Sequence, residues 1–245
     1  GDGNLDIITA NFSDNNASVL LGNGNGTFKS ATSASTGVRP VSVAAADLDG
    51  DGKSEMISVN KDSNSFSVYR NSATVGVVNS NSFEERIDFS TSDNPIGIVS
   101  ADFDGDGKLD LAVLNSQYTI SVFRNTSSAG SFGLASLSAP QNFIGLGINK
   151  CIAAGDVDRD GKVDIIVGYD DHFAVFKNLS SVGAILSNSF SSPIVFGSNI
   201  NLNSLVVIDA DGDGKLDVAG HDISLDGYLA IYRNVSVQGA IDASS

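Results

Sequence analysis

Carboxylate side chains recur at a fixed spacing in a nine-residue block. Four copies are complete: DLDGDGKSE at 47–55, DFDGDGKLD at 102–110, DVDRDGKVD at 156–164 and DADGDGKLD at 209–217. A shortened copy, GDGNLD, opens the chain at residues 1–6. Acids at positions 1, 3 and 5 can converge on one point only if the backbone curls tightly, and the Gly at position 6 supplies the positive φ that this curl requires.

This arrangement of oxygen atoms predicts a Ca²⁺ site. The carbonyl of position 7 and the carboxylate of position 9 would complete a shell of about six to eight oxygens, which suits Ca²⁺ better than Mg²⁺. Turn formation alone would explain one Asp-Gly run, but not alternate acids in five copies. An EF-hand fits less well, because it needs Glu at position 12, where the complete copies have Ser58, Val113, Val167 and Gly220.

Most of the acidic residues of the chain lie in these blocks. The net charge is −15, from 29 acidic and 14 basic residues, and 18 of the acids lie in the five blocks. The basic residues are scattered, which argues against nucleic-acid binding. No apolar run approaches the roughly 18 residues of a membrane span, and the single cysteine, Cys151, excludes an internal disulfide framework.

Short strands must position the blocks. Each block follows an apolar stretch and precedes two segments rich in Val, Ile and Phe; a Ser- and Gly-rich connection then leads to a fourth segment, marked by Phe28, Phe83, Phe132 and Phe190. Successive complete blocks start 55, 54 and 53 residues apart. Four strands in about 50 residues match one blade of a β-propeller, so we predict an all-β propeller of four-stranded blades.

The pattern of strand, DxDGDGxxD, strand and later Gly/Ser-Phe resembles the FG-GAP or VCBS repeat of integrin α-subunit propellers and of many bacterial surface and secreted proteins. The resemblance covers nearly the whole chain as one propeller region, residues 1–245. It implies about four and a half blades of a larger, seven-bladed propeller, with repeats at about 1–39, 40–94, 95–148, 149–202 and 203–245, the first and last incomplete.

The resemblance also implies Ca²⁺ in the loop between the first two strands of a blade. Carried over by position, the side-chain ligands are Asp47, Asp49, Asp51 and Glu55; Asp102, Asp104, Asp106 and Asp110; Asp156, Asp158, Asp160 and Asp164; and Asp209, Asp211, Asp213 and Asp217. Lys53, Lys108, Lys162 and Lys215 would contribute only their carbonyls. Glu55 and Arg159, which replace the usual Asp and Gly, predict weaker or altered sites, and Asp2 and Asp6 form a site only with added ligands.

Two other recurrent features lie outside the blocks. Arg70, Arg124, Lys177 and Arg233 end the third strand of their repeats, which we interpret as a solvated strand end, with a binding ring as the alternative. N-x-S/T sequons, which would permit glycosylation, begin at Asn11, Asn16, Asn25, Asn125, Asn178 and Asn234.

These features predict a non-catalytic, extracellular or cell-surface module in which Ca²⁺ rigidifies each blade and the loops recognise a protein or glycan ligand. No nucleophile motif occurs, and the carboxylates that could act as acid and base are those that the metal would occupy. A lectin and a secreted enzyme such as a polysaccharide lyase are the alternatives. The first lacks the usual aromatic platforms, because the chain has no Trp, and the second lacks clustered Lys, Arg, His or Tyr.

Overall fold

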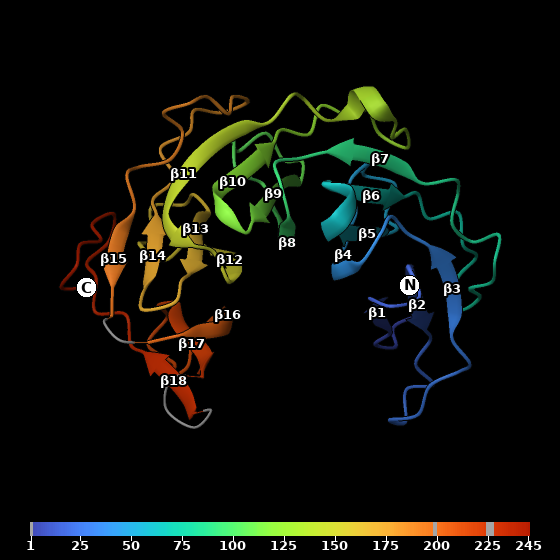
Figure 1. The fold of residues 1–245 in the computed structure, drawn as a ribbon, viewed down its shortest axis with the longest axis horizontal. Coiled ribbons are helices and arrows are strands. Elements are labelled where there is room, and N and C mark those ends of the chain that lie inside the picture. Colours follow the sequence, from blue (N-terminus) through green and yellow to red (C-terminus); the bar gives the residue numbers. More distant parts are fainter. Residues whose placement is uncertain (1, 198–199, 224–227) are drawn as a thin grey trace. The chain divides into compact units, whose positions relative to one another are not determined.

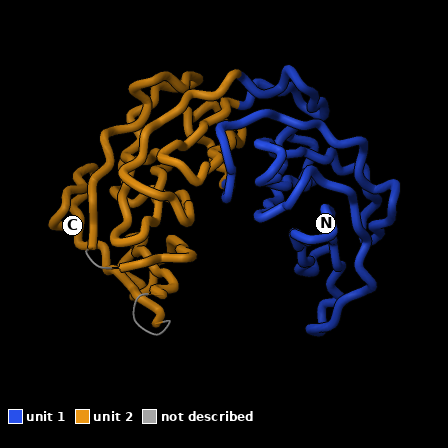
Figure 2. Tube along the Cα trace, in the orientation of Figure 1, with its two compact units in different colours: residues 1–98, 125–138 blue, residues 99–124, 139–245 orange. Residues whose placement is uncertain are grey.

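The computed structural model describes residues 2–197, 200–223 and 228–245. It contains β-strands and two short 3₁₀ helices, and within these residues no helix is long and apolar enough to cross a membrane. The chain divides into two compact units, residues 1–98 with 125–138 and residues 99–124 with 139–245 (Figure 2). Each unit is described by itself.

The first unit holds two antiparallel sheets (Figure 1). The first sheet has the strand order β1-β2-β3, with β1 (Ile7–Asn11), β2 (Asn16–Leu20) and β3 (Thr32–Ser35). The second has the order β4-β5-β6-β7, with β4 (Pro40–Ala46), β5 (Glu55–Asn60), β6 (Ser65–Tyr69) and β7 (Ile87–Ser90). The helices η1 (Lys61–Ser63) and η2 (Leu134–Ser136) also belong to this unit.

The second unit carries the remaining strands. One sheet has the order β11-β10-β9-β8, with β8 (Pro95–Ala101) at the unit boundary, β9 (Asp110–Asn115), β10 (Gln117–Phe123) and β11 (Gln141–Ile148). The next has the order β12-β13-β14-β15, with β12 (Cys151–Gly155), β13 (Asp164–Gly168), β14 (Phe173–Phe176) and β15 (Ile194–Phe196). The last has the order β16-β17-β18, with β16 (Leu202–Ile208), β17 (Asp217–Asp222) and β18 (Tyr228–Tyr232).

The predicted fold class is confirmed, because five antiparallel sheets in series are consistent with a β-propeller fragment. Each sheet lies within one predicted repeat, except that β16 begins one residue before the fifth. The prediction that Phe132 marks the fourth segment of its repeat is wrong. The bridge that Asn178 forms with Phe190 is formed in that repeat by Asn125 with Leu137, so Phe132 lies within the connection, which includes η2.

The second strand of each complete sheet carries the core. Every residue of β5, β9 and β13 is buried, and these strands read as near-continuous apolar runs that end in a polar residue or Gly. Such runs are typical of strands covered on both faces. In the second unit one apolar cluster joins Val157, Ile166, Phe173 and Leu202 across neighbouring sheets. The acidic blocks form the turns from the first to the second strand, and the last acid of each block is the first residue of this buried strand.

Candidate metal centre

Each acidic block folds into a turn held by its own carboxylates. Position 1 accepts the N–H of the position 6 Gly through Oδ2, at 2.8–3.0 Å in all four complete blocks. The acid at position 9 accepts the N–H of position 2, at 2.8–3.1 Å. These bonds connect the two ends of the turn, so the sequence pattern itself specifies the curl.

The curl uses left-handed backbone at positions 4 and 6. Gly52 at position 6 has φ of 86° and Gly50 at position 4 has φ of 69°. Arg159 stands at position 4 of the block at 156–164 and keeps the same conformation, with φ of 59°. The predicted departure at Arg159 therefore leaves the backbone path unchanged, at a conformational cost of about 1–2 kcal/mol for a residue with a Cβ.

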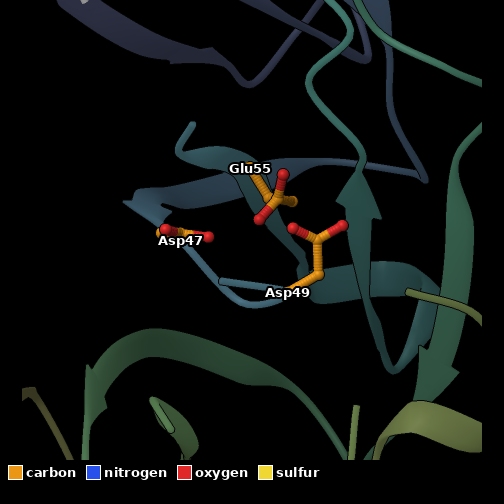
Figure 3. Close-up of side chains that lie close together, drawn as sticks. All are labelled: Asp47, Asp49 and Glu55. Atoms are coloured by element: carbon orange, nitrogen blue, oxygen red, sulfur yellow. The ribbon is translucent and has the colours of Figure 1, made fainter. Parts of the chain in front are cut away.

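The structure gathers the acids of positions 1, 3 and 9. In Figure 3 the carboxylates of Asp47, Asp49 and Glu55 converge at the turn between β4 and β5. In each complete block one oxygen from each of three acids lies within 4.8 Å of the other two. The four groups are Asp47, Asp49 and Glu55; Asp102, Asp104 and Asp110; Asp156, Asp158 and Asp164; and Asp209, Asp211 and Asp217.

The acid of position 5 is placed differently. Its Oδ1 accepts the N–H of the position 7 lysine, at 2.9–3.0 Å in all four blocks. Among the described residues these acids are not part of the gathered groups. They are Asp51, Asp106, Asp160 and Asp213, and the lysines are Lys53, Lys108, Lys162 and Lys215.

The shortened block keeps part of this pattern. Asp2 accepts the N–H of Asn4 at 3.0 Å, and Asp6 accepts the N–H of Gly22 at 2.9 Å. The second bond matches the one that Glu55 accepts from Asn71. Asp2 and Asp6 therefore occupy the places of positions 5 and 9, but within the described residues they do not form a gathered group of three acids.

The position 9 acids Glu55 and Asp164 are buried, and this burial opposes their ionisation. Burial raises the pKa of Asp164 to about 7, and repulsion from Asp158 and Asp160 adds to this, although N–H donors from Asn178 and Val157 oppose it. Burial likewise raises the pKa of Glu55. A cation held among these oxygens would remove the cost of keeping them charged.

The basic residues at the end of the third strand face these acids, so their interpretation as a solvated strand end is wrong for Arg70, Arg124 and Lys177, whereas Arg233 also faces its acids but remains 60% exposed. Arg70 Nε donates to Asp49 Oδ2 at 2.9 Å, and Arg124, Lys177 and Arg233 form ion pairs with the position 3 acid of their own blocks. Three of the four also pair with position 5: Arg124 with Asp106 at 2.7 Å, Lys177 with Asp160 at 3.4 Å and Arg233 with Asp213 at 3.1 Å. One positive charge thus balances part of each block.

Three of the four complete blocks also bond to the repeat that follows them. Asn178 Nδ2 and Ser180 Oγ both donate to the carbonyl of Phe103 at position 2, at 2.8 and 2.6 Å. The N–H of Gly183 donates to the carbonyl of Asp104 at 2.9 Å. The same three bonds recur for two other blocks. Asn125, Ser127 and Gly130 donate to the carbonyls of Leu48 and Asp49, and Asn234, Ser236 and Gly239 donate to the carbonyls of Val157 and Asp158.

These bonds give three of the sequons a structural role. The side chains of Asn125, Asn178 and Asn234 are buried, and their amide nitrogens donate to backbone carbonyls. A glycan on such a nitrogen would break the bond. The recurrence of basic-Asn-x-Ser at the end of the third strand was the available signal, but the sequence does not reveal that its partner lies 75–79 residues earlier.

Comparison with known proteins agrees with this geometry. The FG-GAP-like repeat family matches residues 1–58, 47–113, 102–167 and 156–220, and the chain belongs to this family. No curated protein matches the chain. Among solved structures, the chain is similar to the Photorhabdus luminescens Tc holotoxin pore, at 15% identity and a TM-score of 0.51 over 98% of this chain and 11% of that one.

It is also similar to BBS1N in its complex with ARL6DN, at 14% identity and a TM-score of 0.52 over 84% of this chain and 57% of that one. The chain thus spans a minor part of the toxin chain and little more than half of BBS1N. At these identities the likeness concerns the fold alone.

Proposed function

We propose that this chain is a non-catalytic Ca²⁺-binding module, in which each complete acidic block holds one ion. The observation that carries the proposal is the convergence of three carboxylate oxygens within 4.8 Å, repeated in four blocks. Position 9 is buried in all four blocks, and position 3 is buried in three of them. A donor set made only of oxygen atoms fits a hard cation such as Ca²⁺.

The residues that would hold each ion are the acids of positions 1, 3 and 9, with the position 7 carbonyl as a further donor. The position 5 acid would contribute if it turned from its basic partner towards the ion. When bound, Ca²⁺ supplies positive charge that several oxygen ligands share in a flexible geometry, and no reaction is involved. Each complete block holds four acids, and the basic residue at the end of the third strand and the basic residues within the block supply fewer positive charges, so a divalent ion would add the missing balance.

The same blocks are the places where consecutive repeats join. Leu48, Phe103 and Val157, each at position 2, accept two hydrogen bonds from the next repeat through their carbonyls. An ion that orders the turn would therefore also order these acceptors. Ca²⁺ would then stabilise the association of neighbouring repeats as well as each sheet.

An extracellular or cell-surface location suits such sites, because extracellular modules bind Ca²⁺ with dissociation constants of about 10⁻⁴–10⁻³ M. The exposed loops would recognise a protein or glycan ligand there. Binding on a glycan array would assign the module to the lectins, whereas unsaturated products from acidic polysaccharides would reveal a lyase.

Thermal unfolding with and without chelator tests the metal proposal. Each filled site contributes about 2.7 kcal/mol when free Ca²⁺ is 100 times its dissociation constant, so four sites should shift the midpoint by many degrees. We expect EDTA to lower the midpoint, excess Ca²⁺ to restore it, and Mg²⁺ at the same concentration to restore it only in part. An unchanged transition in excess EDTA would contradict the proposal.

A further inference from the structure

Consecutive acidic blocks of the second unit are joined by a continuous path of hydrogen bonds. The path begins at Asp110, position 9 of its block, whose Oδ2 accepts the N–H of Phe103 at 3.0 Å. The carbonyl of Phe103 accepts the side-chain amide of Asn178 at 2.8 Å, and the backbone N–H of Asn178 donates to Asp164 Oδ1 at 2.8 Å. Asp164 is position 9 of the next block. Asn178 therefore bonds both to a gathered acid of its own block and to the turn of the block before it.

The path continues to the last block with the same pattern. Asp164 Oδ2 accepts the N–H of Val157 at 3.1 Å, and the carbonyl of Val157 accepts the side-chain amide of Asn234 at 2.6 Å. The backbone N–H of Asn234 donates to Asp217 Oδ1 at 2.7 Å, and Asp217 Oδ2 accepts the N–H of Ala210 at 3.0 Å. Three position 9 acids, each with one oxygen in a gathered group, are thus linked through backbone groups and two Asn side chains.

A second connection joins the block at 156–164 to the repeat that follows it. Lys177 Nζ pairs with Asp158 at position 3 and donates to the carbonyl of Gly239 in the fifth repeat, at 2.8 Å. The N–H of Gly239 donates to the carbonyl of Asp158 at 2.6 Å. These contacts hold the loop around Gly239 against Asp158, so the arrangement of the block and that of the following repeat depend on each other.

The links are suited to carry a change from one block to the next. Asn178, Asn234 and the position 9 acids of the three blocks are buried, so a group that loses its partner there has no water to replace it. Without a cation, repulsion between carboxylates favours an opened turn, whereas coordination requires the gathered arrangement. Each turn therefore has two arrangements, and the shared hydrogen bonds make neighbouring turns favour the same one.

We propose that the three blocks of the second unit bind Ca²⁺ with positive cooperativity, because the gathered arrangement of one block favours that of its neighbours through Asn178 and Asn234. This inference rests on the proposed function, since it concerns ions held by the same acids. Coupling between two sites is reciprocal, so a filled block at 156–164 raises the affinity at 102–110 and at 209–217, and the reverse. The second unit then stiffens over a narrow range of Ca²⁺ concentration.

The position 6 glycines give a separate report from each block. The N–H of Gly107, of Gly161 and of Gly214 donates to the position 1 acid of its own block, so its ¹H–¹⁵N NMR signal should move when that block takes up the ion. Titration of the 245-residue chain with CaCl₂ at physiological ionic strength follows the three blocks separately. We expect all three transitions to be steeper than a single-site curve, with Hill coefficients above 1.

Removal of the central site tests whether its neighbours lose affinity. Asp156→Asn with Asp158→Asn takes away two gathered acids of that block with little change in side-chain shape. We expect the dissociation constants reported by Gly107 and Gly214 to rise about fivefold or more. Unchanged constants at both glycines, with Ca²⁺ still bound, would overturn the cooperativity and leave the proposed function intact. No movement of any position 6 signal in the unaltered chain would overturn both.

The charge-matched control is Asp170→Asn with Asp171→Asn, which removes the same charge from the same repeat outside the blocks. At physiological ionic strength this variant should change the constants reported by Gly107 and Gly214 by less than about twofold, because salt screens distant charges. A rise equal to that of the central-site variant would assign the effect to net charge and would overturn the proposal.

Asn178→Ala separates coupling through hydrogen bonds from long-range electrostatics, because it changes no charge. In this background, removal of the central site should no longer affect the constant reported by Gly107, whereas Gly214, linked through Asn234, should still respond. Ser180→Ala, which removes only the bond of its Oγ to the carbonyl of Phe103, is a milder variant that should reduce the response at Gly107. An undiminished response at Gly107 in both variants would overturn the proposal.

Discussion

The blocks at 156–164 and 209–217 share the same acid spacing but differ in how the fold encloses them. The Asp158 side chain is 0% exposed, whereas the equivalent Asp211 is 37% exposed. The carbonyls of Val157 and Asp158 accept three hydrogen bonds from the fifth repeat. The following repeat therefore helps to bury a block, and the sequence of the block alone does not determine how exposed its acids are.

The largest expected difference follows from removing acids. Asp104→Ala with Asp106→Ala should abolish the third repeat's site and lower the Ca²⁺-dependent part of the unfolding free energy by about 2.7 kcal/mol at 100 times the dissociation constant. Asp211→Ala with Asp213→Ala should cost less, because that block is more exposed and its site is weaker. Denaturant titrations in Ca²⁺ and in EDTA measure both.

The control for this pair is Asp170→Ala with Asp171→Ala, two acids outside the blocks. This variant should leave the Ca²⁺-dependent gain unchanged. If this variant lost as much of the Ca²⁺-dependent stability as the Asp104 and Asp106 variant, the stabilisation by Ca²⁺ would reflect general charge screening, and the account of the blocks would be wrong.

The next prediction concerns the bonds between repeats. Asn178→Ala should destabilise the protein by about 2–3 kcal/mol, because it leaves the buried carbonyl of Phe103 and the partly buried carbonyl of Val163 without this donor. Asn71→Ala is the matched control: Asn71 donates to Ser54 within its own repeat, and position 73, where the other repeats have Ser, is Ala. Asn71→Ala should lower the free energy of unfolding by about 1 kcal/mol. Equal losses in equilibrium unfolding would contradict the role of Asn178 between repeats.

How much of this the sequence could predict depends on the distance between partners. The strands, the turn and the convergence of positions 1, 3 and 9 follow from patterns within nine residues or from the repeat period. The placement of Asp106 beside Arg124 does not, because it requires the third strand to return to the turn from 18 residues away. The Asn178 bond to Phe103 spans 75 residues and depends on how two sheets pack. For this reason the sequence spacing predicted the position 5 acid as a ligand in the same way as the acids of positions 1, 3 and 9.

The pH dependence of the metal-free protein should show the cost of the enclosed acids. The pKa of Asp164 rises from 3.8 to about 7 on folding, so the folded state binds more protons between these values. This contribution to stability is complete below about pH 4 and is lost as the pH rises through about 7. In EDTA, Asp164→Asn should flatten this fall in stability. An unchanged slope in that variant would assign the fall to other groups.

The smallest expected effect is at position 4. Arg159→Gly should stabilise the metal-free protein by about 1 kcal/mol, because Gly adopts φ of 59° without the strain of a Cβ. Gly212→Arg makes the reverse change in the exposed block, where a Cβ would meet no atom within 4 Å, and should destabilise by a similar amount. Effects of the same sign in the two variants would show that side-chain contacts outweigh the backbone term.

The most direct test is a calcium anomalous-difference map from crystals grown in Ca²⁺. The account predicts one peak at each of the four complete blocks, within coordination distance of the acids at positions 1, 3 and 9, and a weaker peak at 209–217 than at 156–164. Four blocks without peaks, with their acids turned outward to solvent, would contradict it.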